Sequence, residues 1–267
     1  MHPILLRLGP LTPYTYGLMM VVAFASVTWL STRALNTLPS GMAAITSEQL
    51  VDLCCAALLG GIVGGRLFYV VLHWDEFAPA PVEALAIWRG GLVWYGGFLG
   101  SLTAGWLYVR AKRLTFLRVA DHLMPFIALG HGLGRMGCFF NGCCYGRPTD
   151  AWCGVIFPGH DTAVLPTQLF EALGLFFLYI ALRRMQQPAT LRRPGLVFAA
   201  YMIGYAILRF LIEGLRGDQT PFWIGWTLQQ VISVGLIAAG VVLLSQKAKG
   251  KIQKYNSKGK SKTPASS

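Results

Sequence analysis

The sequence predicts an all-α, polytopic membrane protein with about seven transmembrane helices. Of its 267 residues, 54% are hydrophobic and only 13% are charged, whereas an ordinary soluble domain has roughly 25% charged residues. Seven apolar runs follow one another, and most approach or exceed the roughly 20 residues that a helix needs to cross the hydrocarbon core. They cover residues 17–30, 50–74, 90–109, 119–140, 168–182, 195–215 and 223–245.

The first apolar run is expected to remain in the protein. Gly9, Pro10 and Pro13 interrupt the segment before it, and no small-residue cleavage site follows a sustained apolar core. The first and fifth runs are short but can borrow flanking residues, such as residues 14–16 and Arg183. Because the connecting segments are short, we expect one transmembrane domain over residues 1–246 and a basic, disordered cytoplasmic tail over residues 247–267.

The basic residues predict the orientation of the chain. With the N-terminus outside, 16 of the 23 lysines and arginines fall in cytoplasmic segments, seven of them in the tail, and only four fall in outer loops. This asymmetry favours an N-out, C-in topology. We therefore expect the basic residues behind the net charge of +12 to contact membrane lipids with anionic head groups. No nucleic-acid partner is expected.

Three arginines remain, and each lies inside a predicted span or at its outer end: Arg66, Arg135 and Arg209. An ionisable group within a membrane helix faces protein or a water-filled cavity, and it costs at least about 2.5 kcal/mol at the helix centre. Snorkelling to the interface or an interhelical salt bridge is the alternative for each arginine taken singly. Their common position towards the outer ends of their helices favours one shared site.

A row of polar side chains occupies one face of the sixth predicted span. Tyr205, Arg209 and Glu213 are spaced by four residues and Arg216 follows by three, so the four lie on the same side of a helix. Glu213 can orient Arg209 and hold it charged. Converging guanidinium groups suit a phosphate, because each can donate two parallel hydrogen bonds to anionic oxygens.

Glycines surround the charged residues, and close helix packing explains most of them. Gly96 and Gly97, which follow Tyr95 in an outward-facing turn of the third span, are better candidates for lining a site.

The six cysteines indicate no established metal or redox pattern. Cys54 and Cys55 lie within a predicted span, where cysteine behaves as a small hydrophobic residue. The others are spaced C-x(4)-C-C-x(8)-C, which matches no established zinc or iron–sulfur motif, and we expect no metal site. A structural disulfide between Cys153 and either Cys143 or Cys144 is the alternative for an oxidising compartment.

The stretch HGLGRMGCFFNGCCYGR, residues 131–147, resembles the signature of the bacterial phosphatidylglycerol-prolipoprotein diacylglyceryl transferases. The matching positions are Gly134, Arg135, Gly137, Phe139, Asn141 and Gly146. Two positions depart: Cys138 stands where the signature has asparagine, and Cys143 where it has glutamate. Further segments resemble the family in the same order, and these cover residues 14–20, 64–71, 92–100, 165–172 and 205–219.

This resemblance implies an activity. The family transfers the diacylglyceryl group of phosphatidylglycerol to the lipobox cysteine of a prolipoprotein signal peptide and releases glycerol phosphate. It implies location in the bacterial cytoplasmic (inner) membrane, an active site near the outer leaflet, and no cofactor.

Residue roles follow from the same resemblance. Arg135 and Arg209 match essential arginines and would stabilise the departing phosphate. Glu171 and Glu213 would orient those arginines or accept protons. The remaining substrate-binding candidates are Tyr16, Arg66, Gly96, Gly97, Asn141, Gly146, Tyr205 and Arg216.

The group that deprotonates the incoming thiol is not fixed by the sequence. The family commonly has a histidine, to which a base role is given, at the position of Tyr95. A phenol with an ordinary pKa near 10 is a poor base at neutral pH. His131, one turn before Arg135, could replace it, or guanidinium groups could stabilise the thiolate directly.

Two other hypotheses remain. One is a relative that binds phospholipid or lipoprotein precursors without transfer. The other is a membrane thiol redox protein that uses Cys143 and Cys144.

Overall fold

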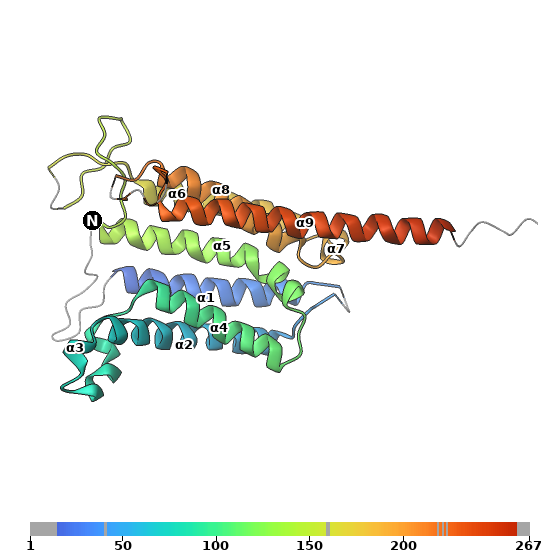
Figure 1. Ribbon diagram of the computed structural model, residues 1–267, viewed down its shortest axis with the longest axis horizontal. Helices are drawn as coiled ribbons and strands as arrows, with labels where there is room; N and C mark the ends of the chain where they lie inside the picture. The colour runs from blue at the N-terminus through green and yellow to red at the C-terminus, as the bar shows by residue number, and fades with distance from the viewer. Residues whose placement is uncertain are drawn as a thin grey trace, which may run out of the picture. The chain divides into compact units, whose positions relative to one another are not determined.

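The structure is a computed structural model that describes residues 15–39, 42–158, 161–217, 219–220, 222 and 224–260, without the side chains of residues 89 and 247–260. Within these residues the regular structure is helical (Figure 1). The helices are α1 (Thr15–Leu35), α2 (Ser47–Leu72), α3 (Trp74–Phe77), η1 (Pro81–Leu85), η2 (Ile87–Arg89), α4 (Trp94–Ala111), α5 (Phe116–Asn141), α6 (Thr167–Met185), α7 (Pro188–Leu191), α8 (Leu196–Glu213) and α9 (Leu228–Lys260).

The helical content agrees with the predicted all-α membrane class. Among the described residues, seven helices have at least 18 residues: α1, α2, α4, α5, α6, α8 and α9. Four of them, α1, α2, α8 and α9, are also apolar enough to span a membrane by length and composition. The other three are α4, α5 and α6. Of these, α5 and α6 carry charged residues of the site described below. The chain is thus a polytopic membrane protein.

The backbone of α9 continues as a helix through Lys260, into the segment predicted as a basic tail. Lysine is a good helix former and the apolar part of α9 lies directly before it, so the helix can propagate into the basic segment without a new nucleation step. The boundary at residue 246 stays a prediction.

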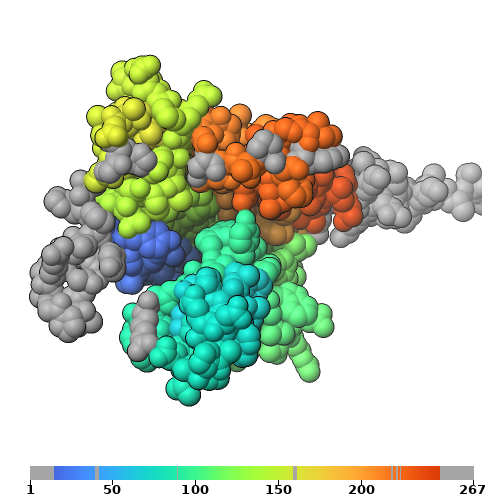
Figure 2. Space-filling view, turned by 60° about the vertical axis from the view of Figure 1, so that its left-hand side comes forward, coloured from blue at the N-terminus to red at the C-terminus, as the bar shows by residue number. Residues whose placement is uncertain are grey.

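Apolar side chains at the surface indicate contact with lipid. On α2, Leu59, Val63 and Leu67 are exposed and are spaced by four residues, so they form one apolar stripe. The membrane part of α9, orange in Figure 2, lies along the surface and exposes Ile232 and Val241. Exposed apolar stripes of this kind are typical of helices that face hydrocarbon.

The chain divides into two compact units. The first contains residues 1–31 and 120–267, and within it α8 packs against α6 and α9 (Figure 1). Asp121 links α5 to the start of α8, because its carboxylate accepts hydrogen bonds from the backbone N–H groups of Gly195 at 2.6 Å and Phe198 at 2.8 Å. An acidic side chain at the start of α8 also interacts favourably with the helix dipole.

The second unit contains residues 32–119, and α2 and α4 form its core. Glycines permit the close approach of these two helices: a Cβ atom at Gly100 would lie 2.1 Å from the carbonyl oxygen of Gly60, and one at Gly96 would lie 2.4 Å from that of Gly64. The packing role expected for most of the glycines thus extends to Gly96, which is also a candidate for lining a site. Its role in a site stays a prediction.

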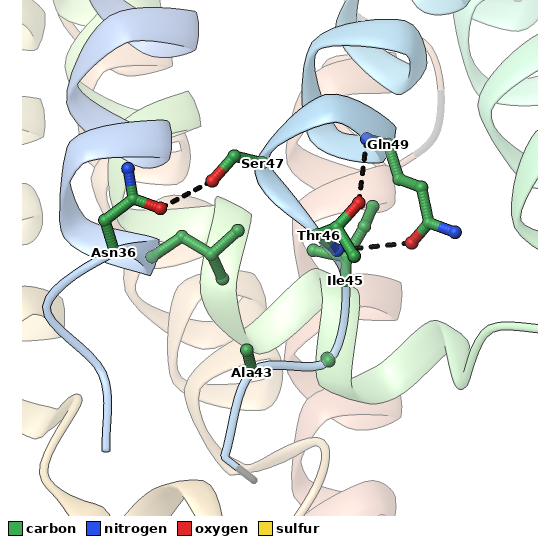
Figure 3. A pocket seen from close by; sticks show the side chains of 8 residues that line it. Asn36, Ala43, Ile45, Thr46, Ser47 and Gln49 are labelled. Carbon is green, nitrogen blue, oxygen red and sulfur yellow. Dashed lines mark hydrogen bonds between the residues drawn. The ribbon is translucent and has the colours of Figure 1, made fainter. Parts of the chain in front are cut away.

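A pocket of about 330 Å³ lies at the beginning of α2 (Figure 3). Its polar groups bind one another: Thr46 and Gln49 form a reciprocal capping box, and the Ser47 hydroxyl lies 2.5 Å from Asn36 Oδ1. These hydrogen bonds hold the start of α2 in place.

Candidate active site

A buried carboxylate, Glu171, is the centre of the ionic cluster in the first unit. It lies in the first turns of α6, and its side chain is only 2% exposed. Oε2 of Glu171 is 3.0 Å from Arg135 Nε of α5 and 3.3 Å from Arg209 Nη1 of α8. Two of the three arginines predicted within spans, Arg135 and Arg209, therefore share one carboxylate. That they form a functional site stays a prediction.

The two arginines differ in how fully they are held. Arg209 donates from Nη1 to Glu171, and its Nη2 lies 2.7 Å from Oε2 of Glu213. Arg135 Nε lies close to Glu171 but without the alignment of a hydrogen bond. Among the described residues, no hydrogen bond involves Nη1 or Nη2 of Arg135, whose side chain is 16% exposed. These two terminal nitrogens, the terminal fork of Arg135, are thus the part of the cluster that is available to an anion.

Glu213 connects the cluster to the start of α9. Its carboxylate, buried completely, accepts a hydrogen bond from the Thr227 hydroxyl at 2.9 Å. Thr227 and Gln230 form reciprocal hydrogen bonds that begin α9. The spacing of Arg209 and Glu213 predicted their contact, whereas no pattern in the sequence indicates the role of Thr227.

Aromatic and imidazole rings border the cluster. His131, one turn before Arg135 on α5, has Nε2 at 3.8 Å from Glu171 Oε1, and its side chain is 29% exposed. Its ring lies 5.2 Å from that of Tyr205, measured between centroids. Tyr16 of α1 lies near the C-terminal end of α5, since a Cβ atom at Gly137 would be 3.4 Å from its ring. His131, Tyr16 and Tyr205 are therefore brought to the same part of the first unit.

The first turn of α6 also holds the loop that follows α5. Thr167 Oγ1 donates to the carbonyl oxygen of Cys144 at 3.0 Å, and Gln168 Nε2 donates to that of Cys143 at 2.7 Å. Thr167 and Gln168 are buried, and we did not predict either as a site residue. Their position one turn before Glu171 on the same helix was the available signal.

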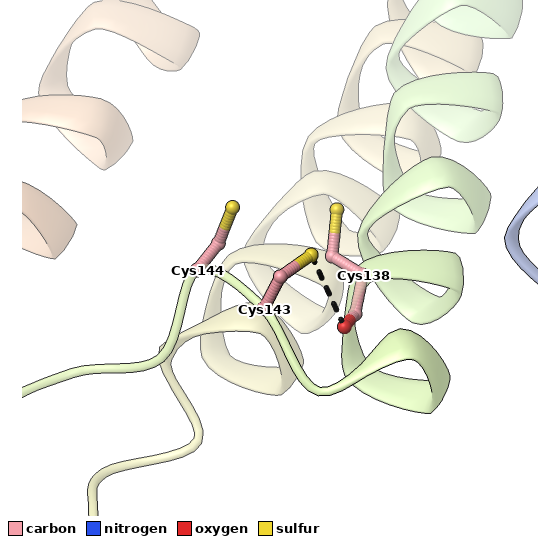
Figure 4. A group of neighbouring side chains, drawn as sticks. All are labelled: Cys138, Cys143 and Cys144. Carbon is pink, nitrogen blue, oxygen red and sulfur yellow. Dashed lines mark hydrogen bonds between the residues drawn. The ribbon is translucent and has the colours of Figure 1, made fainter. Parts of the chain in front are cut away.

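Three cysteines meet at this loop (Figure 4). The Sγ atoms of Cys138, Cys143 and Cys144 all lie within 4.8 Å of one another. None of the six cysteines forms a disulfide, so neither alternative with Cys153 is formed. Hydrogen bonds from the Cys138 and Cys143 thiols, together with the charges of Arg135 and Arg216, lower the pKa of the Cys144 thiol.

Asn141 and Gly146 frame this loop. Asn141 is the last residue of α5, is exposed, and interacts with the Cys143 side chain. Gly146 is buried, and a Cβ atom there would lie 2.7 Å from the carbonyl oxygen of Leu215. The Gly146 N–H donates to the carbonyl oxygen of Leu165. Gly146 is thus required for close packing of three segments near Arg216.

The remaining candidates belong to the second unit. Tyr95 and Gly97 lie in the first turn of α4, and Tyr95 is 49% exposed. Arg66 is buried, and its guanidinium donates to the carbonyl oxygens of Glu83, Ala84 and Gly90 at 2.8 to 2.9 Å. These donors hold the segment between α3 and α4. Arg66 thus has a structural task in this unit, and its contact with substrate stays a prediction.

Comparison with known proteins identifies a single family. Residues 3–246 match the family model described as prolipoprotein diacylglyceryl transferase. The chain is 36% identical over 255 residues to the phosphatidylglycerol–prolipoprotein diacylglyceryl transferase of Photobacterium profundum, with 91% of each chain covered. It is 34% identical over 249 residues to the protein of the same name from Vibrio campbellii, with 91% of this chain and 89% of that protein covered.

Proposed function

The chain belongs to the prolipoprotein diacylglyceryl transferase family, and we propose that the cluster around Glu171 is the part of the protein that carries out the family reaction. This reaction moves the diacylglyceryl group of phosphatidylglycerol to the cysteine thiol of a prolipoprotein. A thioether forms, and glycerol phosphate leaves. The chain is accordingly a membrane transferase of lipoprotein biosynthesis.

Arg135 binds the phosphate of phosphatidylglycerol in this proposal. The observation that carries it is the free terminal fork of Arg135, which lies in a buried cluster next to a carboxylate that keeps the guanidinium charged. A guanidinium group donates two parallel hydrogen bonds to anionic oxygens. As the carbon–oxygen bond of the lipid breaks, negative charge grows on the phosphate, so these hydrogen bonds are strongest in the transition state.

Arg209 of α8 stabilises the same phosphate in this proposal. Glu171 and Glu213 hold its two terminal nitrogens and fix the direction of the guanidinium. Because both carboxylates are almost fully buried, they keep the two arginines charged without exposing an acceptor to water. Glu171 and Glu213 are positioning residues here, and Tyr16, Asn141, Tyr205 and Arg216 are the neighbours we assign to the lipid and peptide.

The membrane arrangement is proposed as seven spans with the N-terminus outside and the active site near the outer leaflet. Arg135 lies near the C-terminal end of α5, Glu171 near the start of α6, and Glu213 at the end of α8. These ends meet in the cluster, whereas Arg183 and Arg184 lie at the opposite end of α6. The positive-inside rule puts the latter in the cytoplasm of a bacterium.

The test is transfer by the purified full-length protein in vesicles that contain phosphatidylglycerol. A lipobox peptide with cysteine should gain the diacylglyceryl group, with stoichiometric release of glycerol phosphate, and the same peptide with serine should not. A folded sample that releases no glycerol phosphate would contradict the proposal and favour a relative that only binds precursors.

The group that accepts the proton is examined in the same assay. His131→Ala and Tyr95→Phe remove the two candidate bases separately. Loss with His131→Ala alone would assign the base to His131. Survival of transfer in both variants would mean that the thiolate is stabilised by a positive group.

A further inference from the structure

Cys138 in the last turn of α5, together with Cys143 and Cys144 in the loop that follows, forms a set of soft ligands that the spacing in the sequence did not reveal. Their Sγ atoms lie within 4.8 Å of one another (Figure 4). Zinc–sulfur bonds of about 2.3 Å in a tetrahedral site separate neighbouring sulfurs by about 3.8 Å. Side-chain rotation alone can therefore bring Cys138, Cys143 and Cys144 onto one ion.

The backbone holds the cysteines in this arrangement at a cost in conformational free energy. Gly142 and Cys144 both have positive φ, at 73° and 62°. For cysteine this left-handed conformation is strained by roughly 1–2 kcal/mol. The Cys143 N–H donates to the carbonyl oxygen of Cys138 at 3.1 Å. The strain turns two consecutive cysteines towards the last turn of α5.

Two buried side chains of α6 hold the loop that contains Cys143 and Cys144. Thr167 and Gln168 of α6 bind the carbonyl oxygens of Cys144 and Cys143, as supporting groups orient metal ligands in other proteins. The same helix carries Glu171, so the cysteine loop and the arginine cluster share one rigid support. Positive charge from Arg135 and Arg216 acts on this loop and would offset the negative charge of a zinc ion with three thiolates.

The cluster leaves one coordination position open. Among the described histidine, cysteine, aspartate and glutamate side chains, the group contains three ligands and no fourth. All three cysteines are half-buried, so a further ligand can enter. Zinc sites with three protein ligands and one open position are the catalytic kind.

We propose that Cys138, Cys143 and Cys144 bind a zinc ion that takes the sulfur of the incoming lipobox cysteine as its fourth ligand. This inference rests on the proposed function, because it assigns the activation of the thiol in that reaction. Arg135 lies one helical turn before Cys138, so the phosphate that it binds and the zinc-bound sulfur would lie on the same face of α5.

The chemistry is a substitution without any change in oxidation state. The peptide thiol loses its proton to water as the sulfur binds zinc, because a coordinating thiol is deprotonated. The sulfur then forms a bond to the terminal glyceryl carbon of the diacylglyceryl group. The carbon–oxygen bond to phosphate breaks, and its electron pair stays with the departing glycerol phosphate. The neutral thioether is a weak ligand and leaves the zinc.

Cobalt binding tests the site directly. Co²⁺ added to the metal-free, reduced full chain in detergent should bind one per protein and give the visible and near-ultraviolet absorption of a thiolate-bound tetrahedral ion. Cys138→Ser, Cys143→Ser or Cys144→Ser should weaken binding by at least about tenfold. Cys153→Ser is the matched control, because Cys153 is free and lies outside the cluster. Binding that is absent, or equally sensitive to Cys153→Ser, would overturn the inference.

Adding the peptide tests the open position. The cysteine lipobox peptide should raise the sulfur-to-cobalt absorption by about one third, as a fourth thiolate joins three, and the serine peptide should not. The same experiment with Cu⁺ in place of Co²⁺ separates zinc from a copper site. Tight Cu⁺ binding together with no response of cobalt to the peptide would overturn the assignment.

The transfer assay separates this inference from the proposed function. Metal-free protein should transfer slowly and recover on addition of Zn²⁺. Full transfer by metal-free protein would overturn the zinc inference and leave the proposed function intact. Coordination of the peptide by the cobalt protein with no transfer by the zinc protein would contradict the proposed function and support the site.

Discussion

Replacement of Glu171 by glutamine removes one negative charge from the centre of the cluster and almost no volume. The carboxylate is 2% exposed and lies 3.0 Å from Arg135 Nε and 3.3 Å from Arg209 Nη1. At an effective dielectric constant of about 20, each of these contacts corresponds to roughly 5 kcal/mol before desolvation is counted. Removal of one partner from a buried pair destabilises by about 3–5 kcal/mol.

The expected loss for Glu171→Gln is smaller than the sum of the two contacts. Arg209 keeps Glu213 at 2.7 Å, and the amide oxygen can still accept one hydrogen bond. We therefore expect the free energy of unfolding to fall by about 3 kcal/mol. Arg135 loses the only ionic partner that it has among the described residues, so misplacement of its guanidinium should lower kcat/KM for transfer by about 100-fold, equivalent to about 2.7 kcal/mol.

Glu213→Gln is the matched variant for this measurement. Glu213 is also fully buried and ionic, but it contacts Arg209 and Thr227 and leaves Arg135 with Glu171. Thermal unfolding in detergent should show similar destabilisation for both variants, while glycerol phosphate release should fall much further for Glu171→Gln. Equal losses of transfer, in proportion to the losses of stability, would refute the idea that Glu171 positions Arg135.

Three further predictions concern packing, loop support and thiol reactivity. Gly100→Ala should destabilise the second unit by about 1–3 kcal/mol, because the new Cβ would lie 2.1 Å from the Gly60 carbonyl oxygen. Gly105→Ala, with 3.7 Å to its nearest neighbour, should leave the melting temperature nearly unchanged, and equal effects would argue against close packing of α2 and α4. Arg66→Lys should raise the rate of backbone amide hydrogen exchange in residues 83–91 at least about tenfold, since an ammonium group cannot make the guanidinium's set of hydrogen bonds. An unchanged exchange rate would mean that this segment is ordered without the Arg66 hydrogen bonds. In the metal-free protein, the lowered pKa of Cys144 keeps the reactive thiolate populated as the pH falls below the ordinary value near 8.5. Mass spectrometry should therefore find Cys144 alkylated by iodoacetamide at pH 6 faster than a peptide cysteine, and an equal rate would show that its neighbours do not stabilise the thiolate.

Local spacing made part of the site predictable from the sequence. Arg209 and Glu213 are four residues apart on a helix, so their contact needed no knowledge of the fold. The apolar runs likewise predicted the long helices, because backbone groups in a membrane must be satisfied within each span. The number of spans rests on the apolar runs and the orientation on charge placement, and both remain predictions.

Contacts between distant segments could not be read in this way. Glu171 meets Arg135 and Arg209 only because α5, α6 and α8 come together at one end. The grouping of Cys138 with Cys143 and Cys144 depends on two residues with positive φ and on two side chains of α6. The spacing of cysteines along the chain carries none of this information.

Arg66 illustrates a different limit. Its position within a predicted span suggested a functional charge, but its hydrogen-bond partners are carbonyl oxygens of residues 83–91. Backbone acceptors are present at every residue, so no sequence pattern reveals which of them a guanidinium will bind.

The most direct test of the account is the kcat/KM for transfer by Arg135→Lys. Lysine keeps the positive charge beside Glu171 but lacks the two-pronged fork that is left free for phosphate. With a melting temperature close to that of the unaltered protein, kcat/KM should fall by about 100- to 1000-fold, the usual effect of losing one donor to developing charge. A variant that stays folded and transfers diacylglyceryl groups within about threefold of the unaltered rate would contradict the assignment of the phosphate to Arg135.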